Sequence, residues 1–369
     1  MKVVSPLLKK VAYPALSSAG VFRRTSASGL AVVTYHGVKP TGYQPVDSAL
    51  DGNLVTAETL RRQLRMLKAH YDVVAPEDVL AWRRGDFQLP RRAVLLTCDD
   101  GLLNCLTDML PVLEEEQVRC LFFATGASAG QTRATFWYEE LFLMLLRAPA
   151  GPFAVSAGRV ELRGELGSRE QRRAIWWDTV KRLSRIDARG RASVLRALQV
   201  ENEWPKADLN ADELDGEDSP ACRRYGLLTG GELRKLIAAG MTIGAHTMSH
   251  PMLSQMPIDL AYAEISESRA ALESALQVPV RAFAYPFGDA GSVTPDVLAM
   301  PQRAGFNAAF LNYGGGLGVD LPPYALHRIH VTAEMSLPEF EAHVSGFYAR
   351  LQRRAGRKPQ AVEMVRASR

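Results

Sequence analysis

Short apolar runs alternate with amphipathic stretches along most of the chain. Leu30–Tyr35 and Ala93–Thr97 are aliphatic and β-branched runs that stop at polar turns, which is typical of strands. In Thr56–His70 the leucines fall on one face and the arginines on the other, which predicts a helix. Further strands are predicted at 71–74, 118–125, 241–245, 280–285 and 306–311. Further helices are predicted from Pro76 onward and at 106–116, 259–276 and 294–304.

These strands are apolar throughout, which indicates a parallel sheet covered on both faces and hence an α/β protein. At least six strand–helix units favour a closed or nearly closed barrel, with an open doubly wound sheet as the alternative. Residues 131–225 break the pattern with an apolar, an Arg-rich and then an acidic stretch, the last at 201–218. We expect a helical insertion in one βα loop, where barrels place functional additions.

The predicted organisation has four parts. A basic N-terminal segment (1–28) precedes a barrel built from 29–130 and 226–345, the insertion occupies 131–225, and a basic tail follows at 346–369. The net charge of +4 divides unevenly, because residues 1–28 carry +5 and residues 350–369 carry +6, which leaves −7 for the rest. An acidic body argues against nucleic acid as a partner. The basic ends suit an anionic membrane surface, and ordinary helix ends explain them equally well.

Targeting signals are not evident in this sequence. Lys9, Lys10 and Pro14 interrupt the first apolar stretch, and no run reaches the length of a membrane-spanning helix. The four cysteines form no CxxC pair, which predicts buried thiols in a reducing compartment. We therefore expect a cytoplasmic protein, with peripheral contact to the inner face of the membrane through its basic ends.

Three motifs with metal-ligating or polar residues each follow a predicted strand. They are TCDDG at 97–101, HTMSH at 246–250 and FAYPFGD at 283–289. In parallel α/β folds the carboxyl ends of the strands form the active site. His246 and His250 are four residues apart, which predicts both rings on one face of a helical turn. With one carboxylate they would form an open catalytic metal site, for which zinc is the first expectation.

Either motif alone carries little weight, since an isolated HxxxH is usually coincidence and an isolated Asp-Asp-Gly is usually a turn. Their combination predicts a metal centre. The segments LLTCDDG, IGAHTMSHPMLS and FAYPFG resemble the signature motifs of the polysaccharide deacetylases, carbohydrate esterase family 4 with the NodB-homology domain. VVTYHGV and HRIHV resemble the branch in which a Tyr-His motif precedes the Asp-Asp motif. The resemblance covers roughly 29–130 and 226–345 and implies a distorted (β/α)7-type barrel.

The resemblance also implies roles for the motif residues. Asp100, His246 and His250 would hold a divalent metal, most readily Zn²⁺, and Asp99 would be the general base. A backbone N–H of the Tyr-Pro-Phe segment would bind the oxyanion, and Phe287 is the candidate because a proline has no N–H.

The leaving amine needs a proton and therefore a general acid, and the branch that this chain resembles places this acid in the early Tyr-His motif. His36 is therefore the expected acid, with His327 and His330 as the alternatives. Because they are three residues apart on a predicted strand, His327 and His330 face opposite sides. Arg328 between them is a further candidate to point inward and pair with Asp99.

Two positions depart from the wider family. Cys98 stands where a Phe is usual, and Ala284 stands where many members have an arginine that partners the base. Arg281 or Arg328 is expected to substitute for that arginine. Asp289 is expected to cap the following helix. The aromatic residues of the insertion could stack on sugar rings, but packing is favoured for all of them: Trp137, Tyr138, Trp176 and Trp177.

The leading hypothesis is a metal-dependent de-N-acetylase in bacterial glycan biosynthesis. Its substrate would be an N-acetylated saccharide, either lipid-linked or nucleotide-activated. An O-acetyl esterase or a hydrolase of non-sugar amides would use the same site, since metal, base and oxyanion donor serve all acyl hydrolysis. A catalytically silent carbohydrate-binding protein is the third hypothesis. The motifs assign neither the sugar nor an oligomeric state.

Overall fold

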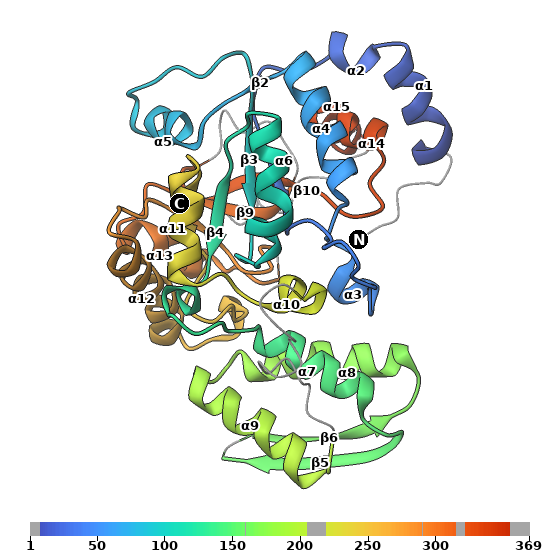
Figure 1. Ribbon diagram of the computed structural model, residues 1–369, viewed down its shortest axis with the longest axis vertical. Coiled ribbons are helices and arrows are strands. Elements are labelled where there is room, and N and C mark those ends of the chain that lie inside the picture. The colour runs from blue at the N-terminus through green and yellow to red at the C-terminus, as the bar shows by residue number, and fades with distance from the viewer. Residues whose placement is uncertain (1–7, 159, 205–218, 290, 315–321, 355–369) are drawn as a thin grey trace.

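The computed structural model describes residues 8–158, 160–204, 219–289, 291–314 and 322–354. Seven parallel strands close into a barrel, because β1 pairs with β10 on one side and with β3 on the other (Figure 1). The strands are β1 (Gly29–Tyr35), β3 (Arg92–Cys98), β4 (Leu121–Ala124), β7 (Thr242–Ala245), β8 (Ala282–Ala284), β9 (Ala308–Gly314) and β10 (Leu326–His330). A short strand, β2 (Asp72–Val73), pairs with the beginning of β3. The expected barrel is confirmed, and the open doubly wound sheet is wrong.

Helices in the connections cover the outside of the barrel. Helix α4 (Ala57–His70) begins after Thr56, whose hydroxyl accepts a hydrogen bond from the Thr59 N–H, and it buries the leucine face read from the sequence. The other helices around the barrel are α3 (Ser48–Asp51), α5 (Pro76–Arg84), η2 (Cys105–Met109), α6 (Leu110–Glu115), η3 (Gly126–Ala129), α11 (Gly230–Ala238), η4 (Leu253–Gln255), α12 (Ile258–Leu276) and α13 (Pro295–Arg303).

Alternate residues of the strands fill the barrel interior. They are Leu30, Val32, Ala93, Leu95, Leu121, Phe123, Ala282, Ala284, Ala308, Phe310 and Leu326. On β7 this position is Gly244, where a Cβ would lie 2.6 Å from the Phe123 ring. The same alternation, continued to the carboxyl ends of the strands, reaches Asp99, His246 and Arg328. The side-chain period of two thus places polar residues directly above an apolar plug.

The insertion between β4 and β7 lies at one end of the barrel (Figure 1, green). It is helical as expected, with α7 (Trp137–Arg147), α8 (Arg169–Leu183), α9 (Ala188–Glu201) and α10 (Pro220–Tyr225). It also contains an antiparallel hairpin, β5 (Gly151–Ala157) with β6 (Val160–Leu166), that the sequence analysis did not anticipate. Phe153 and Val155 are buried between exposed neighbours, and this period of two favours a strand. Most of the acidic run, 205–218, lies outside the described residues.

The first and the last described helices pack together at the other end of the barrel (Figure 1). Three short N-terminal helices lie against two C-terminal ones around a small core of Tyr13, Phe22 and Ala342. The helices are η1 (Leu8–Ala12), α1 (Tyr13–Ser18), α2 (Val21–Arg24), α14 (Leu337–Val344) and α15 (Phe347–Arg354). Residues 1–7 and 355–369, which carry part of the basic charge, lie outside the described residues. Within the described ranges, every helix is too short or too polar to cross a bilayer.

Candidate active site

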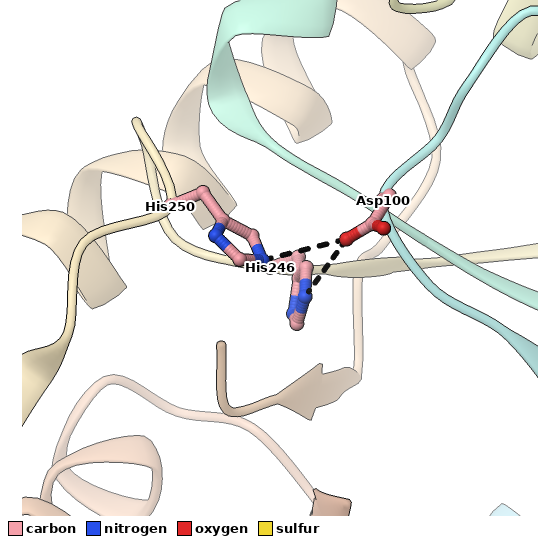
Figure 2. Close-up of side chains that lie close together, drawn as sticks. All are labelled: Asp100, His246 and His250. Atoms are coloured by element: carbon pink, nitrogen blue, oxygen red, sulfur yellow. Dashed lines mark ion pairs between the residues drawn. The ribbon is translucent and has the colours of Figure 1, made fainter. Parts of the chain in front are cut away.

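Asp100, His246 and His250 meet at the carboxyl ends of the barrel strands. Figure 2 shows their side chains pointing toward one another from two segments, with Asp100 in the turn after β3 and both histidines in the loop after β7. Nε2 of His246 and Nε2 of His250 lie 3.6 and 3.4 Å from the same carboxylate oxygen, Oδ1 of Asp100. One ligand atom from each residue lies within 4.8 Å of the other two, and all three residues are buried. Two imidazoles and one carboxylate are a donor set suited to a divalent ion such as zinc.

The hydrogen bonds of the two rings also suit a metal. Nδ1 of His246 lies 2.7 Å from the carbonyl oxygen of Ala284, which can only accept, so Nδ1 carries the proton and the Nε2 lone pair is free for a ligand bond. Burial lowers the pKa of His250, which keeps that ring neutral as a metal ligand must be. Burial alone would raise the pKa of Asp100, but the two adjacent imidazoles hold it well below its usual value. The residues therefore fit a bound divalent ion.

The loop that carries the histidines differs from the sequence prediction. Residues 246–250 form no helical turn, because Thr247 and His250 have left-handed backbones with φ of 65° and 55°. The Thr247 hydroxyl closes the turn by accepting from the His250 N–H at 3.0 Å and donating to the His246 carbonyl at 2.5 Å. The expected helical turn is wrong, yet the two rings still converge, with centroids 4.9 Å apart.

Asp99 pairs with Arg328 in the barrel interior. Nη1 and Nη2 of Arg328 donate to the two carboxylate oxygens at 2.6 and 2.5 Å, and both residues are about 1% exposed. Arg328 also donates to the carbonyl of Leu311 at 2.9 Å, which orients its guanidinium. The other candidate, Arg281, is exposed. Of the two arginines expected as partners of Asp99, Arg328 is the one that pairs with it, from the inward side of β10.

This pair sets the charge of Asp99. Burial by itself raises the pKa of the carboxyl, but the Arg328 guanidinium, with smaller contributions from His246 and His36, brings it below its usual value. Asp99 is therefore ionised at neutral pH. A carboxylate that is buried, ionised and next to the candidate metal site has the protonation state required of a general base.

The three candidate acids occupy different positions. His36 follows β1, is half-buried, and stacks on His330 with ring centroids 4.8 Å apart. Nε2 of His330 lies 3.0 Å from Oδ1 of Asn53, and burial lowers the pKa of His330 to about 3. His327 lies on the outward side of β10, where burial lowers its pKa to about 4. The rings of His327 and His330 are therefore both uncharged at neutral pH.

Phe287 lies in a tight turn after β8. Its backbone is left-handed (φ 59°), and among the described residues its N–H has no hydrogen-bond acceptor. Gly288 follows with φ 59°, and a Cβ there would lie 2.5 Å from the Asn312 nitrogen. The Asp289 carboxylate accepts from the N–H groups of Gly291 and Ser292 at 2.9 Å each. It thus closes a turn. Thr294 caps helix α13, so the expectation that Asp289 caps this helix is wrong.

Aromatic residues of the insertion pack against the candidate metal site. The Tyr138 ring lies 5.0 Å from the His250 ring and 5.9 Å from Phe287. Trp177 contacts Phe287 edge-on at 5.6 Å, while Trp176 is buried and donates to the Tyr138 carbonyl at 2.7 Å. Packing is therefore what these side chains do in this structure.

Two residues that contact the histidines of the site were not identified from the sequence. Phe136 lies 4.9 Å from the His250 ring, and Asn53 bonds His330. The run FWY at 136–138 was a visible aromatic cluster, so its first member could have been included. No pattern near Asn53 indicates its partner, which is 277 residues away.

Comparisons with known proteins agree with this geometry. Residues 218–309 match the family model of the polysaccharide deacetylases, a span that contains His246, His250 and Phe287 but neither aspartate. A curated relative, "Putative polysaccharide deacetylase YxkH" of Bacillus subtilis, is 23% identical over 117 residues. That match covers 32% of this chain and 41% of the relative, so it spans less than half of the relative's length.

Two solved structures share the fold over most of the chain. The Streptococcus pyogenes deacetylase PplD in complex with acetate has a TM-score of 0.53 at 15% identity, covering 86% of this chain and 99% of that one. IcaB from Ammonifex degensii has a TM-score of 0.52 at 17% identity, covering 87% and 98%. The resemblance to the polysaccharide deacetylase family, first indicated by the motifs, is therefore confirmed, and this chain has the family's barrel fold.

Proposed function

We propose that this protein is a metal-dependent hydrolase that removes the N-acetyl group from an amino sugar in a glycan or glycan precursor. The observation that carries the proposal is the buried Asp100–His246–His250 cluster next to the ionised Asp99–Arg328 pair. A family match alone would not distinguish a working enzyme from a silent relative. The intact ligand set, tautomer and base support an enzyme.

Asp99 is the proposed general base, and Arg328 keeps its carboxylate ionised and oriented. A divalent ion held by Asp100, His246 and His250, with zinc as the proposed ion, would polarise the acyl carbonyl and lower the pKa of the attacking water. Asp99 accepts the proton of that water, and its own ionised state depends on Arg328. Because Arg328 is also held by Leu311 and Thr97, the carboxylate stays in one orientation.

Phe287 and His36 complete the proposed machinery. The Phe287 N–H, without an acceptor among the described residues, would donate to the oxyanion that the acyl carbonyl oxygen becomes when water adds to the carbon. His36 would protonate the leaving amine, since the other two histidines are neutral near neutral pH. The rings of Phe136, Tyr138 and Phe287 around His250 exclude water from one side, which strengthens every electrostatic interaction there.

The exposed positive charges near the two ends of the described chain are the basis for a proposal about the protein's location in the cell. Lys9 and Arg23 are engaged with Glu339 and Glu341, each at 2.8 Å. The exposed cations that remain in the described ends are Lys10, Arg24, Arg353 and Arg354. We propose that they hold the protein on an anionic membrane face in the cytoplasm. Helices α2 and α15, which carry Arg24, Arg353 and Arg354, lie at the end of the barrel away from the insertion (Figure 1), so this contact would leave the insertion and the site beside it facing the aqueous phase. That orientation suits a nucleotide-activated saccharide or a long lipid-linked one.

The experiment that tests the function is acetate release by the purified full chain from matched N-acetylated and O-acetylated saccharides. Release from the N-acetylated members supports the proposal, and release from the O-acetylated members alone would replace it with an esterase. His246→Ala is the inactive control. Saccharide binding without any acetate release from either set would favour the silent carbohydrate-binding protein.

A further inference from the structure

The insertion is hydrogen-bonded to the loop that carries His250. Nε1 of Trp137, at the start of α7, donates to the carbonyl of Ser249 at 2.9 Å. Ser249 directly precedes the ligand His250 in the sequence. A side chain from the insertion thus bonds the backbone of the residue adjoining a metal ligand.

Glu264 of helix α12 holds the same serine from the barrel side. Its Oε2 accepts from the Ser249 N–H at 2.8 Å, and its Oε1 accepts from the Ser249 hydroxyl at 2.5 Å. The Glu264 backbone carbonyl accepts from the Met248 N–H at 3.0 Å. One residue of α12 therefore fixes two consecutive residues of the loop.

Arg191 of helix α9 joins the two sides. It is 1% exposed, it donates to the Ser249 hydroxyl, and its Nη2 lies 3.4 Å from Oε1 of Glu264. Its guanidinium lies over the Trp137 ring, 5.2 Å from the centroid. We call Trp137, Arg191, Ser249 and Glu264 the Ser249 clamp. Its charges balance, with one arginine against one glutamate in a buried place.

His250 depends on this clamp in a way that His246 does not. The His246 ring is held by the Ala284 carbonyl, whereas Nδ1 of His250 is buried and has no hydrogen-bond partner in the described structure. The His250 ring is therefore oriented by aromatic packing and by its own backbone. That backbone has a left-handed conformation, which persists only where surrounding contacts enforce it. The clamp supplies such contacts one residue away.

We propose that Trp137 and Arg191 are positioning residues of the metal site, so that the insertion sets metal affinity by fixing the His250 loop. This inference rests on the proposed metal site and deepens it. Indirect partners of metal ligands of this kind change metal affinity by about 10–100-fold when they are removed.

The test is a zinc titration of the full chain after metal removal, with a chromophoric chelator as competitor. Trp137→Phe removes the indole N–H and keeps an aromatic ring, and Arg191→Gln removes the charge. We expect each to raise the zinc Kd by about 10–100-fold. Arg196→Gln, exposed on the same helix α9, is the matched control and should keep the wild-type Kd. His250→Ala is the reference for a lost ligand.

A second readout separates positioning from general stability. Thermal unfolding is measured with and without zinc, and Trp137→Phe should keep the metal-free Tm while losing much of the zinc-induced increase. If Arg191→Gln does not fold, Trp137→Phe carries the test alone. A zinc Kd within about twofold of wild type in folded Trp137→Phe would overturn the role of the clamp. If wild type itself bound no zinc, or if His250→Ala bound it equally well, the metal site would be wrong and the clamp's role with it.

Discussion

Arg328 donates hydrogen bonds to both carboxylate oxygens of Asp99, with nitrogen–oxygen distances of 2.6 and 2.5 Å, inside the carboxyl end of the barrel. The pair crosses from β10 to the turn after β3, two strands that each border β1. A bidentate arginine fixes the orientation of the carboxylate and its charge together. The protonation state of the proposed base therefore depends on a residue from the last strand of the barrel.

Substituting Arg328 should change the pH dependence of catalysis. In Arg328→Gln the burial of Asp99 would be largely unopposed, so its pKa should rise from below its usual value to above it. The carboxylate would then be protonated at the acidic end of the working range. We expect kcat/KM to fall most at low pH and to recover as pH rises, in a profile from about pH 5 to about pH 9. Arg281→Gln, at an exposed site, is the control. An equal loss at every pH would contradict the assignment.

His36 is the proposed proton donor, and its removal should slow turnover without loss of metal. We expect His36→Asn to lower kcat by about 10²–10⁴-fold while zinc affinity stays at the wild-type value. His327→Asn, on the outward side of β10, should keep wild-type turnover. Steady-state kinetics and zinc titration on the same preparations check this. The assignment fails if His327→Asn is the slower of the two variants.

Arg224 ties the insertion to the barrel. This buried arginine donates to Asp51 at 2.7 Å and to Glu139 at 2.8 Å. Arg224→Met would leave two buried acids without their partner, and we expect a loss of about 3–5 kcal/mol in the free energy of unfolding. Arg182→Ala breaks an exposed pair with Asp178 and should cost less than about 1 kcal/mol. Urea unfolding near pH 8 measures both. Equal losses in the two variants would show that burial of the Arg224 pair has no special weight.

Glu139 should make stability depend on pH. Burial raises its pKa from 4.5 to about 7, and the Arg224 charge only partly offsets this. Between those pH values the folded state holds a proton that the unfolded state has lost, so this group's contribution to stability falls as pH rises and levels off above about pH 7. Glu139→Gln should therefore have a smaller decrease in the free energy of unfolding over this window. Glu165→Gln, exposed in the same insertion, should keep the wild-type slope. A wild-type slope in Glu139→Gln would refute the raised pKa.

The sequence was informative wherever a repeating pattern could be read from it. The repeated strand–helix units led to the barrel and to the motifs at the carboxyl ends of its strands, and the side-chain period of two on the strand that carries His327 and His330 led to Arg328 as a candidate partner of Asp99. The sequence could not exclude Arg281, because only the closed barrel shows which positions face inward. The path of residues 246–250 was predicted wrongly, since the spacing of two histidines is equally compatible with a helical turn and with a loop closed by Thr247.

Contacts between distant segments were beyond sequence reasoning. Arg191 meets Ser249 across 58 residues, and Trp137 meets it across 112. Such pairs depend on how the insertion docks, and no local pattern encodes docking. The aromatic residues at the start of α7, Trp137 and Tyr138, predicted packing in general terms, but the segment they pack against, the His250 loop, became visible only in the assembled fold.

The central claim is that one bound ion and Asp99 together hydrolyse an N-acetyl amide. The most direct measurement is acetate release from an N-acetylated amino-sugar oligosaccharide by three samples: enzyme stripped by a chelator, the same enzyme reloaded with zinc, and zinc-loaded Asp99→Asn. We expect no release after stripping, full recovery with about one zinc per chain, and a loss of at least about 10²-fold in Asp99→Asn despite bound zinc. Undiminished release by the stripped enzyme, or by Asp99→Asn, would contradict the claim.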